Sequence, residues 1–329
     1  MNPLLSLCIP TYGRPELLRE TASELIRQAR PHDIRIVISD NSEDERTAQV
    51  IDELRRGYPQ IAYARNEKNL GIDRNFLKVA SMAATEFIWF FGDDDRPEPG
   101  AIDRVLHEVA NAGDIEFFLV NSKPMSPDMQ RELSDNLTGI RADKVYRDCN
   151  IALREISWYS TFVGAFVVRR DAWLSSDPAP WLDTAFVHVG VMFDAMARRA
   201  FALKMIAQPL IGYRTGAATW SGNFLNIQFV LWKRAIDRLP VAFDAASRQV
   251  AIESVIERFV TPGVLAGLRI SGMLDARAYR TLVLPWFARA RKTRGLPWRV
   301  GLAGALVLLL PVGLLAAARR AYRRLRHGA

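Results

Sequence analysis

The sequence predicts an α/β fold in which a mixed, mostly parallel β-sheet is flanked by helices. Short apolar runs alternate with helical patterns over the first third of the chain, which is the arrangement that builds parallel strands joined by helices. The chain has 329 residues, of which 49% are apolar, so it can bury a sizeable core. A helical extension and a tail rich in arginine are expected to follow the sheet domain.

The first half of the sheet domain is expected to contain five strands and four helices. The first strand stops at Pro10, and the helix after it places Leu18, Ala22 and Leu25 on one face. The fourth strand is strongly apolar and ends in Gly92. The expected strands are residues 4–9, 34–39, 61–65, 86–91 and 115–121, and the expected helices are residues 15–28, 44–56, 73–84 and 101–112.

The second half is less regular. A polar excursion at residues 123–150 precedes a strand at 161–168, a helix at 185–200 and a strand at 203–213, and further helices are expected at 223–239 and 245–268. The sequence therefore predicts a sheet domain over residues 1–222, a helical extension over 223–293 and a membrane-associating segment over 294–329.

Polar residues follow three of the predicted strands. Ligands of such sheets bind beyond the carboxyl ends of the strands. This rule selects the segments at residues 10–12 (Pro-Thr-Tyr), 40–42 (Asp-Asn-Ser) and 93–95 (Asp-Asp-Asp) as the parts of a ligand site.

The acidic triplet indicates a divalent cation. Three adjacent carboxylates repel one another unless a positive charge lies close, and Mg²⁺ or Mn²⁺ is commonly held by one or two carboxylates together with substrate phosphates. A simple helix N-terminus is the alternative, since Pro97 and Pro99 follow closely, but one Asp would serve that purpose. An aspartyl phosphatase would need Asp-x-Asp after the first strand, and a nucleotidyltransferase would need a Gly-rich loop there; Pro-Thr-Tyr-Gly-Arg-Pro fits neither.

Four segments in order, SLCIPTYGRPELL, IVISDNSEDE, NLGIDRNF and FIWFFGDDDRPEPGAI, resemble the successive motifs of family 2 glycosyltransferases with the GT-A fold. The resemblance covers residues 4–121 and fades after about residue 215. It implies an inverting enzyme that uses a nucleotide-diphospho-sugar and Mg²⁺ or Mn²⁺.

The resemblance also implies roles for individual residues. Thr11 and Tyr12 match positions that line the nucleotide base, and Asp40 matches the acidic residue that recognises the base or the ribose. Residues 40–42 also suit an ordinary turn, and both roles can coexist. Arg74, next to Asn75, matches a position near the donor diphosphate, although a solvated helix arginine is an equal alternative.

The resemblance also implies a register for the triplet. In the commonest family pattern a Pro lies seven residues after the first Asp of Asp-x-Asp, and here Pro99 lies seven residues after Gly92. This register implies that Asp93 faces the ribose or the donor sugar and that Asp94 lies at the metal. The other register pairs Asp93 with Asp95, so Asp95 remains a second candidate metal ligand.

The family usually supplies an acidic general base, often in a Glu-Asp pair, and no such pair occurs in the matching stretch WLDTAFVHVGVMFDAM. The candidates in this stretch are His188, Asp183 and Asp194. His188 is preferred because imidazole titrates near neutral pH, and Asp183 is the second choice. A packed, hydrogen-bonded histidine is the alternative for His188. The following segment, residues 213–223, suits a flap in which Arg214 meets phosphate and Trp220 stacks on a sugar.

The positive charge is confined to the tail. The formal net charge is +8, but ten Lys and Arg residues and no acidic residue lie from Arg289 onwards. The body of the chain is therefore slightly acidic, which argues against nucleic acid as a partner. Two cysteines exclude a disulfide framework.

An uncharged run at residues 300–318 lies between two groups of five basic residues. Its length permits a membrane span, but a span would place one basic group outside the cytoplasm. A surface-lying or re-entrant helix bent at Pro311 is therefore preferred, with a single span second and a buried helix third. We expect the protein at the cytoplasmic face of the bacterial inner membrane.

Together these features predict transfer of a hexose or deoxyhexose from a nucleotide-diphospho-sugar to a hydroxyl of a lipid-linked glycan, in polysaccharide or lipopolysaccharide assembly. The alternative is a non-catalytic membrane-associated assembly protein that retains the fold. A processive synthase is excluded because no Gln-x-x-Arg-Trp motif is present.

Overall fold

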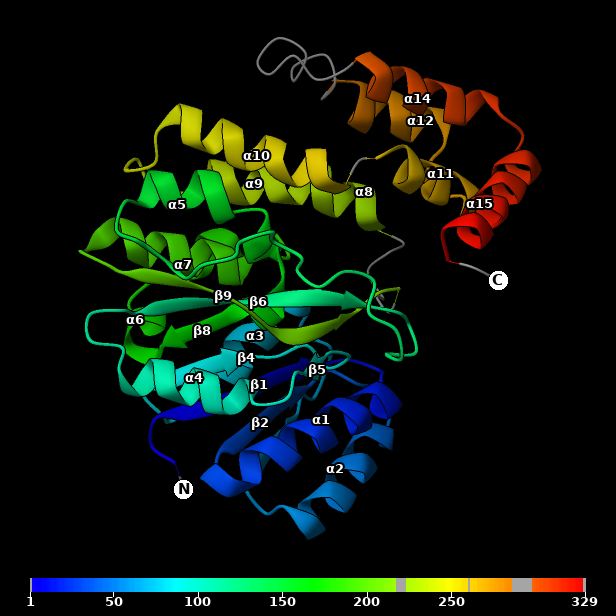
Figure 1. The fold of residues 1–329 in the computed structure, drawn as a ribbon. Coiled ribbons are helices and arrows are strands. Elements are labelled where there is room, and N and C mark those ends of the chain that lie inside the picture. Colours follow the sequence, from blue (N-terminus) through cyan, green and yellow to red (C-terminus); the bar gives the residue numbers. More distant parts are fainter. Residues whose placement is uncertain (1, 217–222, 260, 286–297, 328–329) are drawn as a thin grey trace.

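The computed structural model of the chain describes residues 2–216, 223–259, 261–285 and 298–327 (Figure 1). A mixed sheet forms its centre, with strand order β3-β2-β1-β4-β8-β6-β9-β5 and with β7 added to β9. The strands are β1 Leu5–Thr11, β2 Arg35–Asp40, β3 Ile61–Arg65, β4 Phe87–Phe90, β5 Arg96–Pro97, β6 Phe117–Met125, β7 Lys144–Tyr146, β8 Phe166–Arg169 and β9 Leu203–Arg214.

Helices cover the sheet and form the C-terminal region. Those of the sheet region are α1 Pro15–Ala29, α2 Arg46–Gly57, α3 Ile72–Ser81, α4 Ala101–Ala110, α5 Cys149–Ile156, α6 Arg170–Leu174 and α7 Val187–Arg198. The C-terminal region contains α8 Phe224–Asn226, the π-helical turn η6 Ile227–Leu231, α9 Trp232–Asp237, α10 Ala245–Phe259, α11 Pro262–Ile270, α12 Ala276–Ala278, the π-helical turn η7 Tyr279–Val283, α14 Trp298–Leu309 and α15 Val312–His327.

The first four strands in the sheet order are parallel, as the sequence predicts. Thr11 at the end of β1 pairs with Asp40 at the end of β2, and Cys8 pairs with Phe90 at the end of β4. The carboxyl ends of these strands therefore meet at one edge. Beyond β4 the sheet becomes mixed, because β8 is antiparallel to both β4 and β6.

Alternating side chains of the strands supply two apolar clusters. In β1, Leu7 and Ile9 join the cluster that contains Leu18 of α1 and Ile102 of α4, whereas Cys8 joins the other cluster. Successive side chains of a strand point to opposite faces, so these clusters lie on the two faces of the sheet. The rigid sheet between them holds the strand ends in place.

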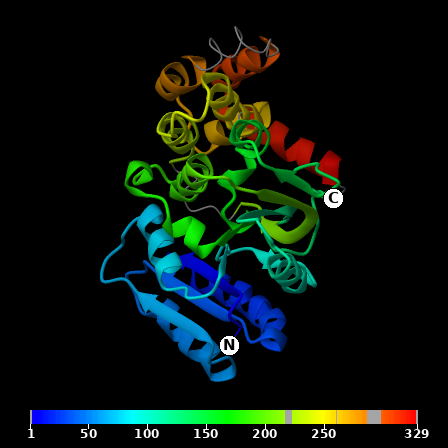
Figure 2. The same cartoon turned by 90° about the vertical axis from the view of Figure 1, so that its left-hand side faces the viewer.

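The C-terminal helices extend the cluster that contains Cys8. Figures 1 and 2 place them at the opposite end of the molecule from α1 and α2. Leu265 of α11, Val307 of α14 and Leu315 of α15 belong to the same buried cluster as Cys8 and Val37. The predicted domain boundaries at 222 and 293 border or fall within residues that the structure does not describe, so these boundaries remain a prediction.

One predicted helix is split in two. The helix expected at residues 245–268 divides into α10 and α11 because Pro262 lacks an N–H and disfavours helical geometry at the preceding residue. Thr261 caps the new helix by accepting a hydrogen bond from the N–H of Val264 at 3.3 Å.

The uncharged run at residues 300–318 is likewise divided, between α14 and α15, at Leu310 and Pro311. Among the residues described, no helix combines the length and the apolar character needed to cross a membrane. Leu306, Leu309 and Leu314, near this break, are 54%, 81% and 56% exposed.

Candidate active site

Thr11, Asp40 and the acidic triplet meet at the parallel edge of the sheet. Asp40 is fully buried, and its carboxylate accepts hydrogen bonds from the N–H of Ser42 and the hydroxyl of Tyr63, both at 2.8 Å. Burial and the hydrogen bond to Asp40 raise the pKa of Tyr63 well above its usual value. Tyr12 is half exposed beside them. The carboxylate of Asp40 thus stabilises the turn and lies at the edge where ligands of such sheets bind.

Arg14 forms ion pairs with two members of the acidic triplet. Its guanidinium contacts Asp93 and lies 2.8 Å from the carboxylate of Asp94. The hydroxyl of Thr11 donates to Asp93 at 2.7 Å. Burial raises the pKa of Asp93 to about 6, and the guanidinium opposes this rise. Arg14 is not among the predicted site residues; the signal that could have found it is a basic residue between a strand end and a helix start.

Asp95 is buried on the inner side of the triplet. Its carboxylate accepts a hydrogen bond from the N–H of Arg214 at 3.1 Å, and burial raises its pKa well above the usual value. The Arg214 side chain donates to the carbonyl of Asp94 at 2.8 Å and forms an ion pair with Glu20 at 2.6 Å. Arg214 therefore holds the acidic loop in place, in contrast to the phosphate contact expected of it. Trp220, its predicted partner in the flap, lies outside the described residues.

Gly92 makes room for the folded-back side chain of Asp95. A Cβ atom at Gly92 would lie 2.5 Å from the Asp95 carboxylate oxygen. Any larger residue would therefore force that carboxylate to move. The conformation of the triplet therefore depends on the glycine that lies between β4 and Asp93.

The carboxylates fit a hard divalent cation at one position. Among the described residues, no three His, Cys, Asp or Glu side chains gather as a ready metal cage. The side chain of Asp94 is 17% exposed, whereas that of Asp93 is 2% exposed. Both carboxylates already bind the positively charged guanidinium of Arg14, so the site accommodates a cation. A cation that takes one protein carboxylate and completes its shell with substrate phosphates fits Asp94. Asp95 is turned inwards in this structure.

Three consecutive residues of α3 join the two halves of the site. Asn75 donates from its amide to the carbonyls of Thr11 and Ser39, each at 3.2 Å, which braces the ends of β1 and β2. Arg74 is surface-exposed and forms an ion pair with Asp183 at 2.7 Å. Asp73 points to the loop before α7, so α3 links the strand ends to the loop that carries a candidate base.

Asp73 is the acceptor for that whole loop. Its carboxylate accepts hydrogen bonds from the N–H groups of Thr184 and Ala185 at 2.9 Å and of Val187 at 3.1 Å. Asp183 and Ala185 both adopt a left-handed backbone conformation, with φ of 62° and 65°. The loop is therefore held in a specific shape that leaves the Asp183 side chain 73% exposed.

His188 lies in the core. It is 2% exposed, its ring stacks on Phe76 and contacts the edge of Phe166, and neither ring nitrogen has a hydrogen-bond partner. Burial lowers the pKa of His188 to about 3, with a smaller opposing effect from the main chain at Ser160 and Thr161. A ring buried in this way does not face an acceptor hydroxyl, which argues against His188 as the general base.

Comparison with known proteins connects these residues to a family. Residues 6–149 match the model of glycosyl transferase family 2. Abequosyltransferase RfbV of Salmonella typhimurium is 30% identical over 220 residues, which is 63% of this chain and 66% of that protein. The GalNAc(5)-diNAcBac-PP-undecaprenol beta-1,3-glucosyltransferase of Campylobacter jejuni is 31% identical over 117 residues, 35% of this chain and 37% of that protein. The matches thus span two thirds or less of these relatives.

Solved structures show the same fold at low sequence identity. S. aureus TarS 1-349 in complex with UDP-GlcNAc superposes with a TM-score of 0.57 at 15% identity, covering 88% of each chain. The mannosyltransferase PcManGT from Pyrobaculum calidifontis in complex with GDP-Man and Mn²⁺ has a TM-score of 0.51 at 15% identity, covering 100% of this chain and 89% of that one. These similarities agree with the mixed, mostly parallel sheet described above.

Proposed function

The chain belongs to glycosyltransferase family 2, and we propose that it transfers a sugar from a nucleotide-diphospho-sugar to a glycan hydroxyl with inversion. One observation carries this proposal: Thr11, Asp40 and Asp93 meet at the carboxyl ends of neighbouring parallel strands, with Asp94 at their open side. The Salmonella and Campylobacter relatives are named as sugar transferases, which supports the same reaction class.

The donor is proposed to lie along this edge. The ring of Tyr12 offers an exposed flat surface to the base, and the carboxylate of Asp40 can accept from a base N–H or a ribose hydroxyl. Asp93 faces the ribose or the sugar. Arg74, expected near the diphosphate, pairs with Asp183 in this structure and is assigned to the acceptor side of the site. A Mg²⁺ or Mn²⁺ ion at Asp94, when bound, neutralises charge on the leaving diphosphate.

Asp183 is the base that we propose. Inversion requires a group that takes the proton of the acceptor hydroxyl on the face away from the leaving diphosphate. Asp183 is exposed, lies on a loop fixed by Asp73, and is oriented by its ion pair with Arg74. His188 has neither the exposure nor the polar contacts for this role.

The acceptor is proposed to be a lipid-linked glycan in cell-surface polysaccharide or lipopolysaccharide assembly. The exposed leucines at the α14–α15 break, within a tail of ten basic and no acidic residues, suit an anionic membrane surface. We therefore propose that the enzyme works at the cytoplasmic face of the bacterial inner membrane, with the α14–α15 break against the lipid.

The test uses the full chain and a panel of nucleotide sugars. With Mn²⁺ present, the correct donor at about 100 times its Kd should raise the unfolding temperature by about 5 °C. The same donor should then release nucleotide when glycan acceptors are added. If no nucleotide sugar stabilises the protein, the non-catalytic assembly role becomes the better interpretation.

A further inference from the structure

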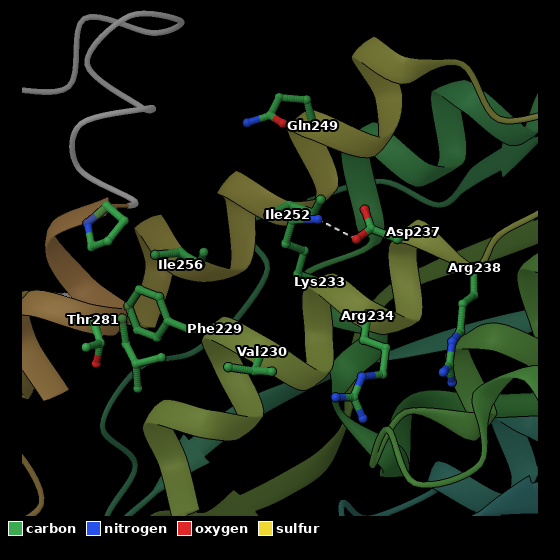
Figure 3. A pocket seen from close by; sticks show the side chains of 12 residues that line it. Phe229, Val230, Lys233, Arg234, Asp237, Arg238, Gln249, Ile252, Ile256 and Thr281 are labelled. Atoms are coloured by element: carbon green, nitrogen blue, oxygen red, sulfur yellow. Dashed lines mark hydrogen bonds and ion pairs between the residues drawn. The ribbon is translucent and has the colours of Figure 1, made fainter.

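A surface groove of about 490 Å³ lies away from the acidic triplet, between η6 and α9 on one side and α10 and η7 on the other. Figure 3 shows its side chains. Half of them are apolar and half are polar: Phe229, Val230, Ile252, Ile256, Leu282 and Pro285 on the one hand, and Lys233, Arg234, Asp237, Arg238, Gln249 and Thr281 on the other.

The groove has an apolar end and a basic end. Phe229 and Ile256 lie together at one end, whereas Arg234 of α9 and Arg238, which directly follows α9, extend in a common direction towards the other end (Figure 3). Lys233 forms an ion pair with Asp237. Arg234 is exposed and has no ion pair or hydrogen bond with any described residue. Three cations and one carboxylate therefore leave the basic end positive.

The two π-helical turns of the C-terminal region both line the apolar end. Phe229 and Val230 belong to η6, and Leu282 belongs to η7. A π-helical turn carries an extra residue per turn at the cost of poorer packing, and such turns occur often at functional sites. Their meeting in one groove is a second observation that points to a ligand.

The basic end adjoins the loop that carries the proposed base. Arg238 donates to the carbonyl of Pro180 at 2.5 Å, and the indole N–H of Trp181 donates to the carbonyl of Ala235 at 3.2 Å. These bonds fix the turn at residues 179–181 onto α9. Asp183 follows two residues later, so a ligand seated at Arg234 lies beside the segment leading to Asp183.

We propose that this groove binds the diphosphate and the first isoprenoid units of a polyprenyl-diphosphate-linked acceptor, an inference that rests on the proposed sugar transfer. Arg234 contacts the diphosphate from the same side of α9 as Arg238, and a guanidinium is the cation that complements such an anion. The hydrocarbon chain lies on Val230, Ile252 and Ile256. The glycan attached to the diphosphate then extends past the turn at residues 179–181 towards Asp183.

The experiment measures binding of geranylgeranyl diphosphate to the full-length protein by calorimetry in non-ionic detergent. Arg234→Gln should weaken binding about tenfold, the range for losing one hydrogen bond to a charged group. Arg56→Gln is the matched control, because Arg56 is also an exposed helix arginine. Geranylgeraniol, which lacks the diphosphate, should bind the wild type and Arg234→Gln equally and weakly.

A second variant separates this groove from the donor site. Asp94→Asn should bind geranylgeranyl diphosphate like the wild type while losing transfer, because Asp94 is not in the groove. Equal binding by Arg234→Gln and the wild type would refute the groove, as would loss of binding in Asp94→Asn, which would place the diphosphate in the donor site. Failure of the donor screen would instead count against sugar transfer and leave the binding result unaffected.

Discussion

The carboxylate of Asp73 accepts a hydrogen bond from the main-chain N–H of Thr184, which is 111 residues away in the sequence. The same carboxylate accepts from Ala185 and Val187, so one buried side chain at the start of α3 fixes the entry to α7. Its neighbour Arg74 pairs with Asp183 on this loop. The start of α3 thus controls the position of the proposed base.

Asp73→Ala should therefore lower both stability and turnover. Removing the acceptor leaves buried N–H groups unpaired, at a cost of about 3 kcal/mol in the free energy of unfolding. Urea unfolding measures this loss, and turnover should fall more than donor affinity. Asp103→Ala, which removes an exposed aspartate from the first turn of α4, should change little. A stable, fully active Asp73→Ala would contradict the anchoring role.

Asp183→Asn should lower turnover about a hundredfold or more, the range for losing a general base, and leave donor binding nearly unchanged. Asp171→Asn is the control, since Asp171 is 87% exposed on α6. Steady-state transfer with a soluble acceptor is the measurement. If Asp183→Asn stays active and His188→Gln is inactive although folded, the role of base belongs to His188.

Asp94→Asn should abolish transfer without unfolding the protein, because a neutral amide replaces a metal-bound carboxylate poorly. EDTA should inactivate the wild type, and added Mn²⁺ or Mg²⁺ should restore it. Asp128→Asn, in the exposed loop after β6, serves as the matched control. Full transfer by the wild type in EDTA would rule out the metal.

His188 should make the protein less stable in acid. Its pKa falls from 6.5 to about 3 on folding, so between these values the unfolded chain takes up a proton that the folded chain does not. Stability is therefore lost as the pH falls through this window. From about pH 7.5 to about pH 5.5 the wild type should lose about 1 kcal/mol more than His188→Leu.

Urea unfolding at the two pH values measures this difference. The raised pKa of Asp93 acts in the opposite direction, but it is common to both proteins and cancels. An identical pH dependence in the two proteins would mean that His188 is hydrated or paired in solution.

Leu309→Asp and Leu314→Asp should weaken binding to vesicles that contain anionic lipid, by about tenfold each, because each replaces an exposed leucine that would insert into the lipid interface. The control is Leu133→Asp with Leu174→Asp, which alters leucines 41% and 51% exposed elsewhere. Point variants are preferred to truncation, since Gly304 packs against Tyr279 and Leu265 and removal of the tail would bare them. Equal sedimentation of both pairs with vesicles would contradict the membrane contact.

The strands and the strand-end residues could be predicted because their signals are local. An apolar run followed by Asp40 or by the acidic triplet needs only its own sequence to be recognised, and these parts were placed within a few residues. The break at Pro262 also has a local signal, the proline itself, but the apolar periodicity continues across it and favours one long helix.

The partners of charged residues could not be predicted in the same way. Asp73 resembles an ordinary residue of a helix first turn until the fold brings Thr184 to it. From the sequence alone, Arg214 resembles a phosphate ligand. In the fold, its guanidinium donates instead to the carbonyl of Asp94 and the carboxylate of Glu20. His188 has the chemistry of a base, but its enclosure by Phe76 and Phe166 is a property of packing.

The two apolar clusters differ in when synthesis can complete them. The last residue of the cluster beneath α1 and α4 is Ile211, whereas the other cluster includes Leu315. At roughly 5–20 residues per second, a ribosome takes on the order of 5–20 seconds to cover that interval. During this time the nascent chain can form the first cluster while α3 and α7 still lack their C-terminal partners. A chaperone that binds apolar surface has its opportunity then, and a stalled ribosome would leave this face exposed.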